Sequence, residues 1–167
     1  MFPPDLIAQA EAILADFRKR GLKLATAESC TGGLVAGVLT EIAGSSGVVE
    51  RGFVTYSNAA KQELLGVPDE MLAAHGAVSE PVARAMAEGA LAHSSADVAV
   101  AVTGVAGPDG GTAAKPVGLV HFAAARRGGE ILHRECRFGD IGRSQVRLTS
   151  VREALQLVLR AAGAATP

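Results

Sequence analysis

The chain has 167 residues, of which 49% are hydrophobic and 20% charged, and its formal net charge is −1. This balance excludes a disordered or fibrous chain, and it gives no general positive charge for binding nucleic acid or an anionic membrane. The length suits one domain, so we expect a single domain over residues 1–167. The two cysteines are too few for a disulfide framework or a zinc cluster. With no signal peptide and no run of about 20 apolar residues, the sequence predicts a cytoplasmic protein.

Alternating helical and extended patterns follow one another along the chain. Apolar residues at helical spacing, with a helix start or stop signal at the ends, predict helices at about 4–20, 31–42, 58–66, 79–93 and from 143 onward. Short segments rich in apolar and β-branched residues predict strands at about 22–27, 48–57, 97–103, 117–125 and 131–138. Asn58 is the expected N-cap of the third helix, and the tail from Ala161 is expected to fray.

This order of elements predicts the fold class. Helices between the early strands indicate parallel crossover connections, whereas the last two strands form a hairpin with antiparallel pairing. We therefore expect an α/β protein, a three-layer α/β/α sandwich around a mixed, mostly parallel sheet of about five strands. Ligands of such sheets bind beyond the carboxyl ends of the strands, so polar residues that follow strands are the candidates for a site.

The first candidate segment lies between the first strand and the second helix. Ser29 is placed there as a nucleophile, and N–H groups of Thr31, Gly32 and Gly33 at the helix start could bind an anion or an oxyanion. The alternative is that Ser29 or Thr31 only caps the helix. Cys30 has no activating histidine nearby in the sequence and is interpreted as a buried structural thiol.

The second candidate segment follows the second strand. It holds Tyr56, the only tyrosine, and Lys61, which falls in the first turn of the next helix. The helix dipole disfavours a cation there, and desolvation would lower the lysine pKa further, which leaves a neutral amine that can act as a base. The alternative is a solvated lysine on the surface.

Two further segments carry weaker signals. Thr103 and Gly104 begin a glycine-rich loop that could present N–H groups to a ligand, although it matches no nucleotide-binding fingerprint and is also compatible with an ordinary turn. Arg143 and Arg147 could share one face at the start of the last helix, where they could bind phosphate or be two solvated arginines bridged to Asp140. The four histidines are scattered without the spacing of a metal site, so no metal is expected.

Several of these segments, in the same order, resemble the CinA C-terminal domain family, which is called competence/damage-inducible protein after its multidomain members. The resemblance covers nearly the whole chain, and its motifs are ATAESCTGG at 25–33, YSN at 56–58 with Lys61, HGAVS at 75–79, TGVAGP at 103–108, GGT at 110–112 and KPVG at 115–118. It implies deamidation of nicotinamide mononucleotide (NMN) to nicotinic acid mononucleotide and ammonia, a step of pyridine nucleotide salvage and NAD metabolism. The implied enzyme is a serine amidohydrolase that uses no metal and no cofactor.

The resemblance also implies residue roles. It makes Ser29 the nucleophile and Lys61 the base that activates it, with Tyr56, Thr103 and Arg143 as supporting residues. The family usually has Gly-Asp-Arg before its last helix, whereas Ile141 and Gly142 stand before Arg143 here. The carry-over to Arg143 is therefore weaker than that to Ser29.

The partners expected from this interpretation are a small nucleotide substrate and further copies of the chain in a homo-oligomer, with no nucleic acid and no membrane. Two alternatives stay open at this point. One is a non-catalytic nucleotide-binding or scaffold module linked to competence and DNA damage. The other is an amidase for a different small amide.

Overall fold

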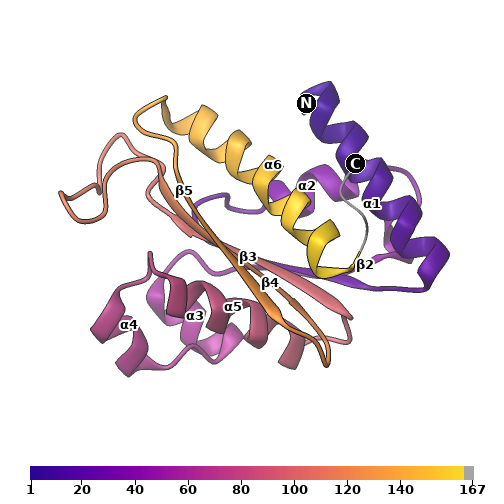
Figure 1. The fold of residues 1–167 in the computed structure, drawn as a ribbon, viewed down its shortest axis with the longest axis horizontal. Coiled ribbons are helices and arrows are strands. Elements are labelled where there is room, and N and C mark those ends of the chain that lie inside the picture. Colours follow the sequence, from indigo (N-terminus) through magenta and orange to yellow (C-terminus); the bar gives the residue numbers. More distant parts are fainter. Residues whose placement is uncertain (164–167) are drawn as a thin grey trace.

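A five-stranded mixed sheet forms the middle layer of the protein in a computed structural model that describes residues 1–163 (Figure 1). The strands are β1 (Leu24–Glu28), β2 (Val49–Val54), β3 (Val98–Gly104), β4 (Leu119–Arg126) and β5 (Ile131–Arg137). Their order across the sheet is β2-β1-β3-β4-β5. The parallel part is β2-β1-β3, and β4 pairs antiparallel with both β3 and β5. The predicted three-layer sandwich with a mixed sheet is confirmed.

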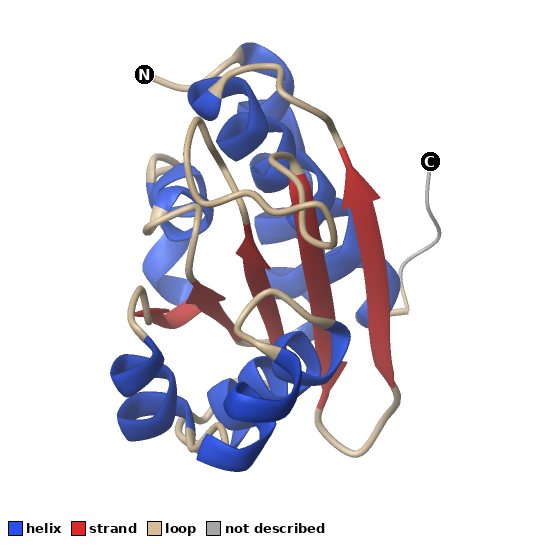
Figure 2. Ribbon diagram, turned by 90° about the vertical axis from the view of Figure 1, so that its left-hand side faces the viewer, coloured by secondary structure: helices blue, strands red, loops and turns tan. Residues whose placement is uncertain are grey.

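Helices cover both faces of this sheet (Figures 1 and 2). One face carries α1 (Pro4–Arg20), α2 (Leu34–Thr40) and α6 (Arg143–Ala161). The other face carries α3 (Asn58–Leu65), α4 (Asp69–His75) and α5 (Glu80–Ala92). A short 3-10 turn, Ser45–Gly47, precedes β2.

The alternation of side chains along the central strand separates two apolar cores. The valines of β3 point toward α1, α2 and α6, whereas its Ala99 and Ala101 point toward α5. Small side chains on this second face let the helices approach closely. A Cβ at Gly89 of α5 would lie 2.0 Å from the carbonyl oxygen of Leu65, so glycine is required where α5 crosses the end of α3. This close contact holds α3, which carries Lys61, against α5, which itself packs on the sheet.

Several element boundaries differ from those predicted. The second helix begins at Leu34 rather than residue 31, because Gly32 and Gly33 take positive φ values of 60° and 98° and form a turn first. The N-cap of α3 is Ser57, whose Oγ accepts a hydrogen bond from the amide of Ala60, and not Asn58. The helix α4 was not predicted, since its seven residues are too few to show a helical period. Of the tail expected to fray, residues 164–167 lie outside the described residues.

The topology brings three strand ends to one edge. Because β1, β2 and β3 are mutually parallel, their carboxyl ends at Glu28, Val54 and Gly104 point the same way. Residues that follow these ends therefore lie near one another, as the sequence predicts for Ser29 and Tyr56.

Candidate active site

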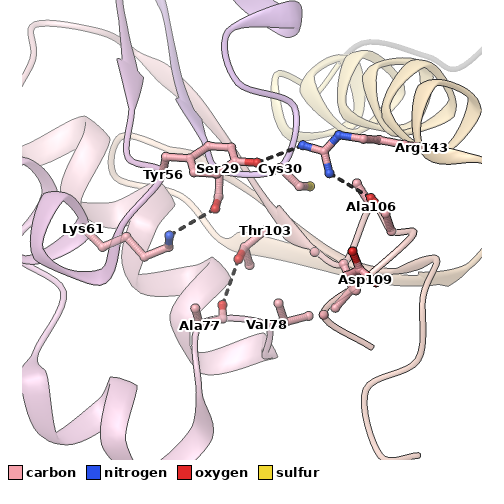
Figure 3. A pocket seen from close by; sticks show the side chains of 14 residues that line it. Ser29, Cys30, Tyr56, Lys61, Ala77, Val78, Thr103, Ala106, Asp109 and Arg143 are labelled. Carbon is pink, nitrogen blue, oxygen red and sulfur yellow. Dashed lines mark hydrogen bonds between the residues drawn. The ribbon is translucent and has the colours of Figure 1, made fainter. Parts of the chain in front are cut away.

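A cavity of about 300 Å³ opens at this edge of the sheet (Figure 3). Its size is at the lower end of the range for small-molecule sites. The residues that line it come from the ends of β1, β2 and β3, from α3 and α6, and from two loops: Ser29, Cys30, Tyr56, Lys61, Ala77, Val78, Thr103, Gly104, Val105, Ala106, Gly107, Asp109, Gly110 and Arg143. Six residues that the sequence singles out as site candidates are among them.

The serine and the lysine of this cavity are in direct contact. The Nζ of Lys61 lies 3.1 Å from the Oγ of Ser29 and 2.8 Å from the carbonyl oxygen of Thr55, and it donates a hydrogen bond to each. Lys61 is only 1% exposed, so the interpretation as a solvated surface lysine is wrong. Burial lowers the pKa of Lys61, because the charged ammonium loses its hydration. The arrangement thus places an amine, whose neutral form burial favours, within proton-transfer distance of a hydroxyl group.

This buried amine should make the stability of the protein depend on pH. Between the lowered pKa of folded Lys61 and the ordinary value of 10.5, the unfolded chain binds more protons than the folded one. The free energy of unfolding should therefore rise with pH through this window and level off above it. We expect Lys61→Met to lack this rise, and urea unfolding of both proteins at about pH 7 and pH 10 measures it. Equal pH dependence of the two proteins would contradict the burial effect.

Ser29 is held by its backbone, and it does not cap the following helix. Its amide donates to the carbonyl oxygen of Val102 at 2.9 Å, and its own carbonyl accepts from Gly32 at 3.0 Å. The cap of α2 is supplied instead by the carboxylate of Glu28, which accepts hydrogen bonds from the amides of Gly33, Val35 and Ala36. The capping alternative for Ser29 is therefore wrong. Glu28 was not predicted as a cap, because it lies in a strand five or more positions before the amides that it binds.

Thr31, Gly32 and Gly33 were expected to bind substrate, but the structure does not bring them to the cavity wall formed by the described residues. Their backbone groups serve the turn instead. The carbonyl oxygens of Cys30 and Thr31 accept hydrogen bonds from Arg147, which joins α6 to this turn.

Several backbone N–H groups of the cavity wall are available for a ligand. Within residues 1–163, the amides of Cys30, Ala106 and Gly107 are among those that donate to no protein acceptor. They belong to the residue after Ser29 and to the glycine-rich loop that follows β3. Free amides near a hydroxyl group are typical elements of an oxyanion site.

Arg143 and Tyr56 lie together at the mouth of the cavity (Figure 3). The Arg143 guanidinium donates to the Tyr56 hydroxyl and to the carbonyl oxygen of Gly107, both at 2.9 Å. This contact ties α6 to the glycine-rich loop and to the end of β2. Arg143 does not form the pair with Asp140 that the sequence left open. Because a guanidinium has five N–H donors, Arg143 keeps donors for a ligand.

Two other sequence candidates have structural roles. Thr103 is 1% exposed, and its hydroxyl donates to the carbonyl oxygen of Ala77 at 2.8 Å, which holds the segment before α5 against the end of β3. Cys30 is 5% exposed, and burial raises the pKa of its thiol to about 12. A thiol with this pKa stays protonated at neutral pH and is a poor nucleophile, as expected for a structural cysteine.

Metal-binding residues do not gather at this site. Among residues 1–163, no group of three or more histidine, cysteine, aspartate or glutamate side chains could hold a metal ion. His121 and His133, which lie on neighbouring strands, hydrogen-bond to each other at 3.0 Å.

None of the helices within residues 1–163 has the length and apolar character needed to span a membrane.

The fold and the site together define an α/β protein with a serine–lysine pair in a small-molecule cavity. The family model for the CinA C-terminal domain matches residues 7–162. The chain therefore belongs to the CinA C-terminal domain family, as its motifs predict.

Relatives and a solved structure show the same likeness. Nicotinamide-nucleotide amidohydrolase PncC of Escherichia coli K12 is 54% identical over 157 residues, which are 93% of this chain and 94% of that protein. A competence-damage inducible protein of Symbiobacterium thermophilum is 70% identical over 110 residues, which are 66% of this chain but only 26% of that longer protein. The crystal structure of the competence/damage inducible protein CihA of Agrobacterium tumefaciens superposes with a TM-score of 0.96 at 57% identity, over 97% of this chain and 98% of that one.

Proposed function

We propose that this protein is an amidohydrolase that converts NMN to nicotinic acid mononucleotide and ammonia. The observation that carries the proposal is the 3.1 Å hydrogen bond between Lys61 Nζ and Ser29 Oγ in a cavity at the edge of the sheet. A relative that is named nicotinamide-nucleotide amidohydrolase and matches over 94% of its length supports the choice of substrate.

The first half of the reaction forms an acyl-enzyme. Neutral Lys61 takes the proton of the Ser29 hydroxyl while Ser29 Oγ bonds to the carboxamide carbon of the substrate. The carbonyl oxygen becomes an oxyanion, which the free amides of Cys30 and of the glycine-rich loop can bind. The ammonium of Lys61 then returns the proton to the leaving nitrogen, the carbon–nitrogen bond breaks, and ammonia departs.

The second half releases the product. A water molecule loses a proton to neutral Lys61 and attacks the ester carbon, and the resulting intermediate expels Ser29 Oγ, which recovers the proton. The product is the nucleotide carboxylate. Because Lys61 must be neutral at the start of each half, its lowered pKa serves both steps.

The chemistry of NMN matches the groups around the cavity. Its positively charged pyridinium ring withdraws electrons from the carboxamide and eases attack by Ser29. Its phosphate is an anion, and Arg143 places a guanidinium with free donors at the mouth of the cavity. We assign Arg143 to the phosphate, whereas Arg147 is engaged with the carbonyl oxygens of Cys30 and Thr31.

This assignment predicts a binding defect in Arg143→Ala. Loss of charged hydrogen bonds to phosphate should raise the KM for NMN by about tenfold or more, because each such bond contributes roughly 1.5–3 kcal/mol. The same variant should act almost normally on nicotinamide riboside, which lacks the phosphate. Arg152→Ala is the matched control, because Arg152 lies on α6 like Arg143, pairs with Asp5 of α1 and does not line the cavity. An equal rise of KM for NMN and for nicotinamide riboside would contradict the assignment of Arg143 to the phosphate.

An ammonia-release assay tests the proposed function against its two rivals. We expect the purified protein to release ammonia from NMN much faster than from nicotinamide or other small amides. Release from another amide but not from NMN would favour an amidase of different specificity. If the protein releases ammonia from no amide, a non-catalytic module is favoured. Such a module has no need of a lysine amine that is hydrogen-bonded to a serine hydroxyl.

A further inference from the structure

We propose that Glu28 is a positioning residue for Ser29, because its buried carboxylate joins the start of α2 to the end of β1 and fixes the turn that carries the nucleophile. The inference rests on the proposed function in one respect, namely that Ser29 attacks the substrate. The role of Glu28 is not catalytic, since its side chain is buried against the start of α2 and does not line the cavity.

Both oxygen atoms of the Glu28 carboxylate accept hydrogen bonds inside the protein. Glu28 is 0% exposed. Its Oε2 accepts from the amides of Gly33 and Val35, both at 3.0 Å, and its Oε1 accepts from the amide of Ala36 at 2.9 Å. These amides would otherwise be unpaired at a helix start. A buried carboxylate with three N–H donors is a stable arrangement that leaves little freedom to the turn between Glu28 and Gly33.

The main chain of Glu28 connects the same residue to the catalytic pair. Its carbonyl oxygen accepts from the amide of Thr55 at 2.8 Å, and the carbonyl oxygen of Thr55 accepts from Lys61 Nζ at 2.8 Å. Lys61 in turn contacts Ser29. Successive residues of a strand point to opposite faces, so Glu28 faces α2 while Ser29 faces α3. One residue therefore anchors both the turn and the position of the base.

This arrangement also explains why the turn residues do not line the cavity. The carboxylate of Glu28 neutralises the start of α2 and occupies its amides, so an anionic substrate group gains nothing there. The oxyanion must then be bound elsewhere, and the free amides of Cys30, Ala106 and Gly107 are candidates in the described cavity wall.

The test compares Glu28→Gln and Glu28→Asp with Thr26→Val. Thr26 is a matched control, because it is fully buried on the same strand and face, and its hydroxyl has no partner among the described residues. We expect Glu28→Gln to lower kcat for NMN by about tenfold to a hundredfold with little change in KM, since small displacements of a nucleophile cost that much. Glu28→Asp, which keeps the charge but is too short for all three amides, should lose less. Thr26→Val should behave as the wild type.

Two readouts separate positioning from a general loss of structure. Amide exchange should quicken at the start of α2 in Glu28→Gln, while the rest of the sheet stays protected. The pH midpoint of kcat should not move, because Lys61 itself is unchanged. A lower midpoint with normal activity at high pH would show that Glu28 acts through its charge on Lys61 and would overturn the proposal.

A measurement without NMN keeps this inference separate from the proposed function. The rate at which a small serine-directed phosphonate labels Ser29, followed by the mass of the intact protein, should fall in Glu28→Gln and less in Glu28→Asp. Ser29→Ala gives the background. If the wild type is labelled but does not hydrolyse NMN, the proposed function fails and the labelling rates still decide the role of Glu28. If Glu28→Gln does not fold, Glu28→Asp decides, and labelling of that variant at the wild-type rate would overturn the inference.

Discussion

Ser29→Ala is expected to lower kcat for NMN by about a thousandfold or more, because the hydroxyl that forms the acyl-enzyme is lost. Binding should be nearly unchanged, since Ser29 contributes a single small group to a cavity with many lining residues. Steady-state ammonia release at saturating NMN measures the loss, and binding of NMN to the inactive variant can be followed by calorimetry.

A second serine provides the control for this substitution. Ser95 is exposed at the other edge of the sheet, and Ser95→Ala should keep full activity. Ser29 is half-buried and packs into no apolar core, so Ser29→Ala should unfold near the wild-type temperature. Full activity in Ser29→Ala would exclude a serine mechanism.

The second large effect concerns the base. Lys61→Ala should lower kcat by about a hundredfold to ten-thousandfold, the usual contribution of a general base. Lys61→Arg should not restore activity, because arginine remains protonated and cannot accept the serine proton. Activity of Lys61→Arg at the wild-type level would show that positive charge, and not proton transfer, is what the site needs.

The double variant and the pH profile sharpen this test. Ser29 and Lys61 act as a unit, so Ser29→Ala with Lys61→Ala should be about as slow as the slower single variant. In the wild type, kcat should rise with pH as Lys61 loses its proton. The midpoint should lie below the ordinary lysine value of 10.5, because burial favours the neutral amine. A midpoint at the ordinary value would contradict the burial effect on catalysis.

The contact between Ser29 and Lys61 could be predicted because its signals are local. Ser29 follows a strand that is apolar enough to be central, and Lys61 falls in the first turn of a helix, so parallel topology alone brings both to one edge. The extent of Lys61 burial could not be predicted. It depends on the contact of α3 with α5 at Gly89, which joins segments far apart in the sequence.

The role of the turn after β1 was the main difference from the prediction. Periodicity placed the helix start at residue 31, but two glycines with positive φ delay it to Leu34 and turn the amides toward Glu28. A strand residue that caps a helix from five to eight positions away leaves no regular spacing in a single sequence. The homo-oligomer and the cytoplasmic location stay predictions of the sequence.

Partitioning with hydroxylamine tests the central claim most directly, namely that Ser29 forms an acyl-enzyme with the nicotinoyl group of NMN. Hydroxylamine competes with water for an acyl-enzyme and converts it to a hydroxamate, whereas direct attack of water on the amide gives only the acid. We predict that the wild type with NMN and hydroxylamine releases ammonia and forms the nucleotide hydroxamate at the expense of nicotinic acid mononucleotide, and that Ser29→Ala forms neither. Ammonia release without hydroxamate at any hydroxylamine concentration would contradict the acyl-enzyme, and the absence of ammonia release from NMN would contradict the function itself.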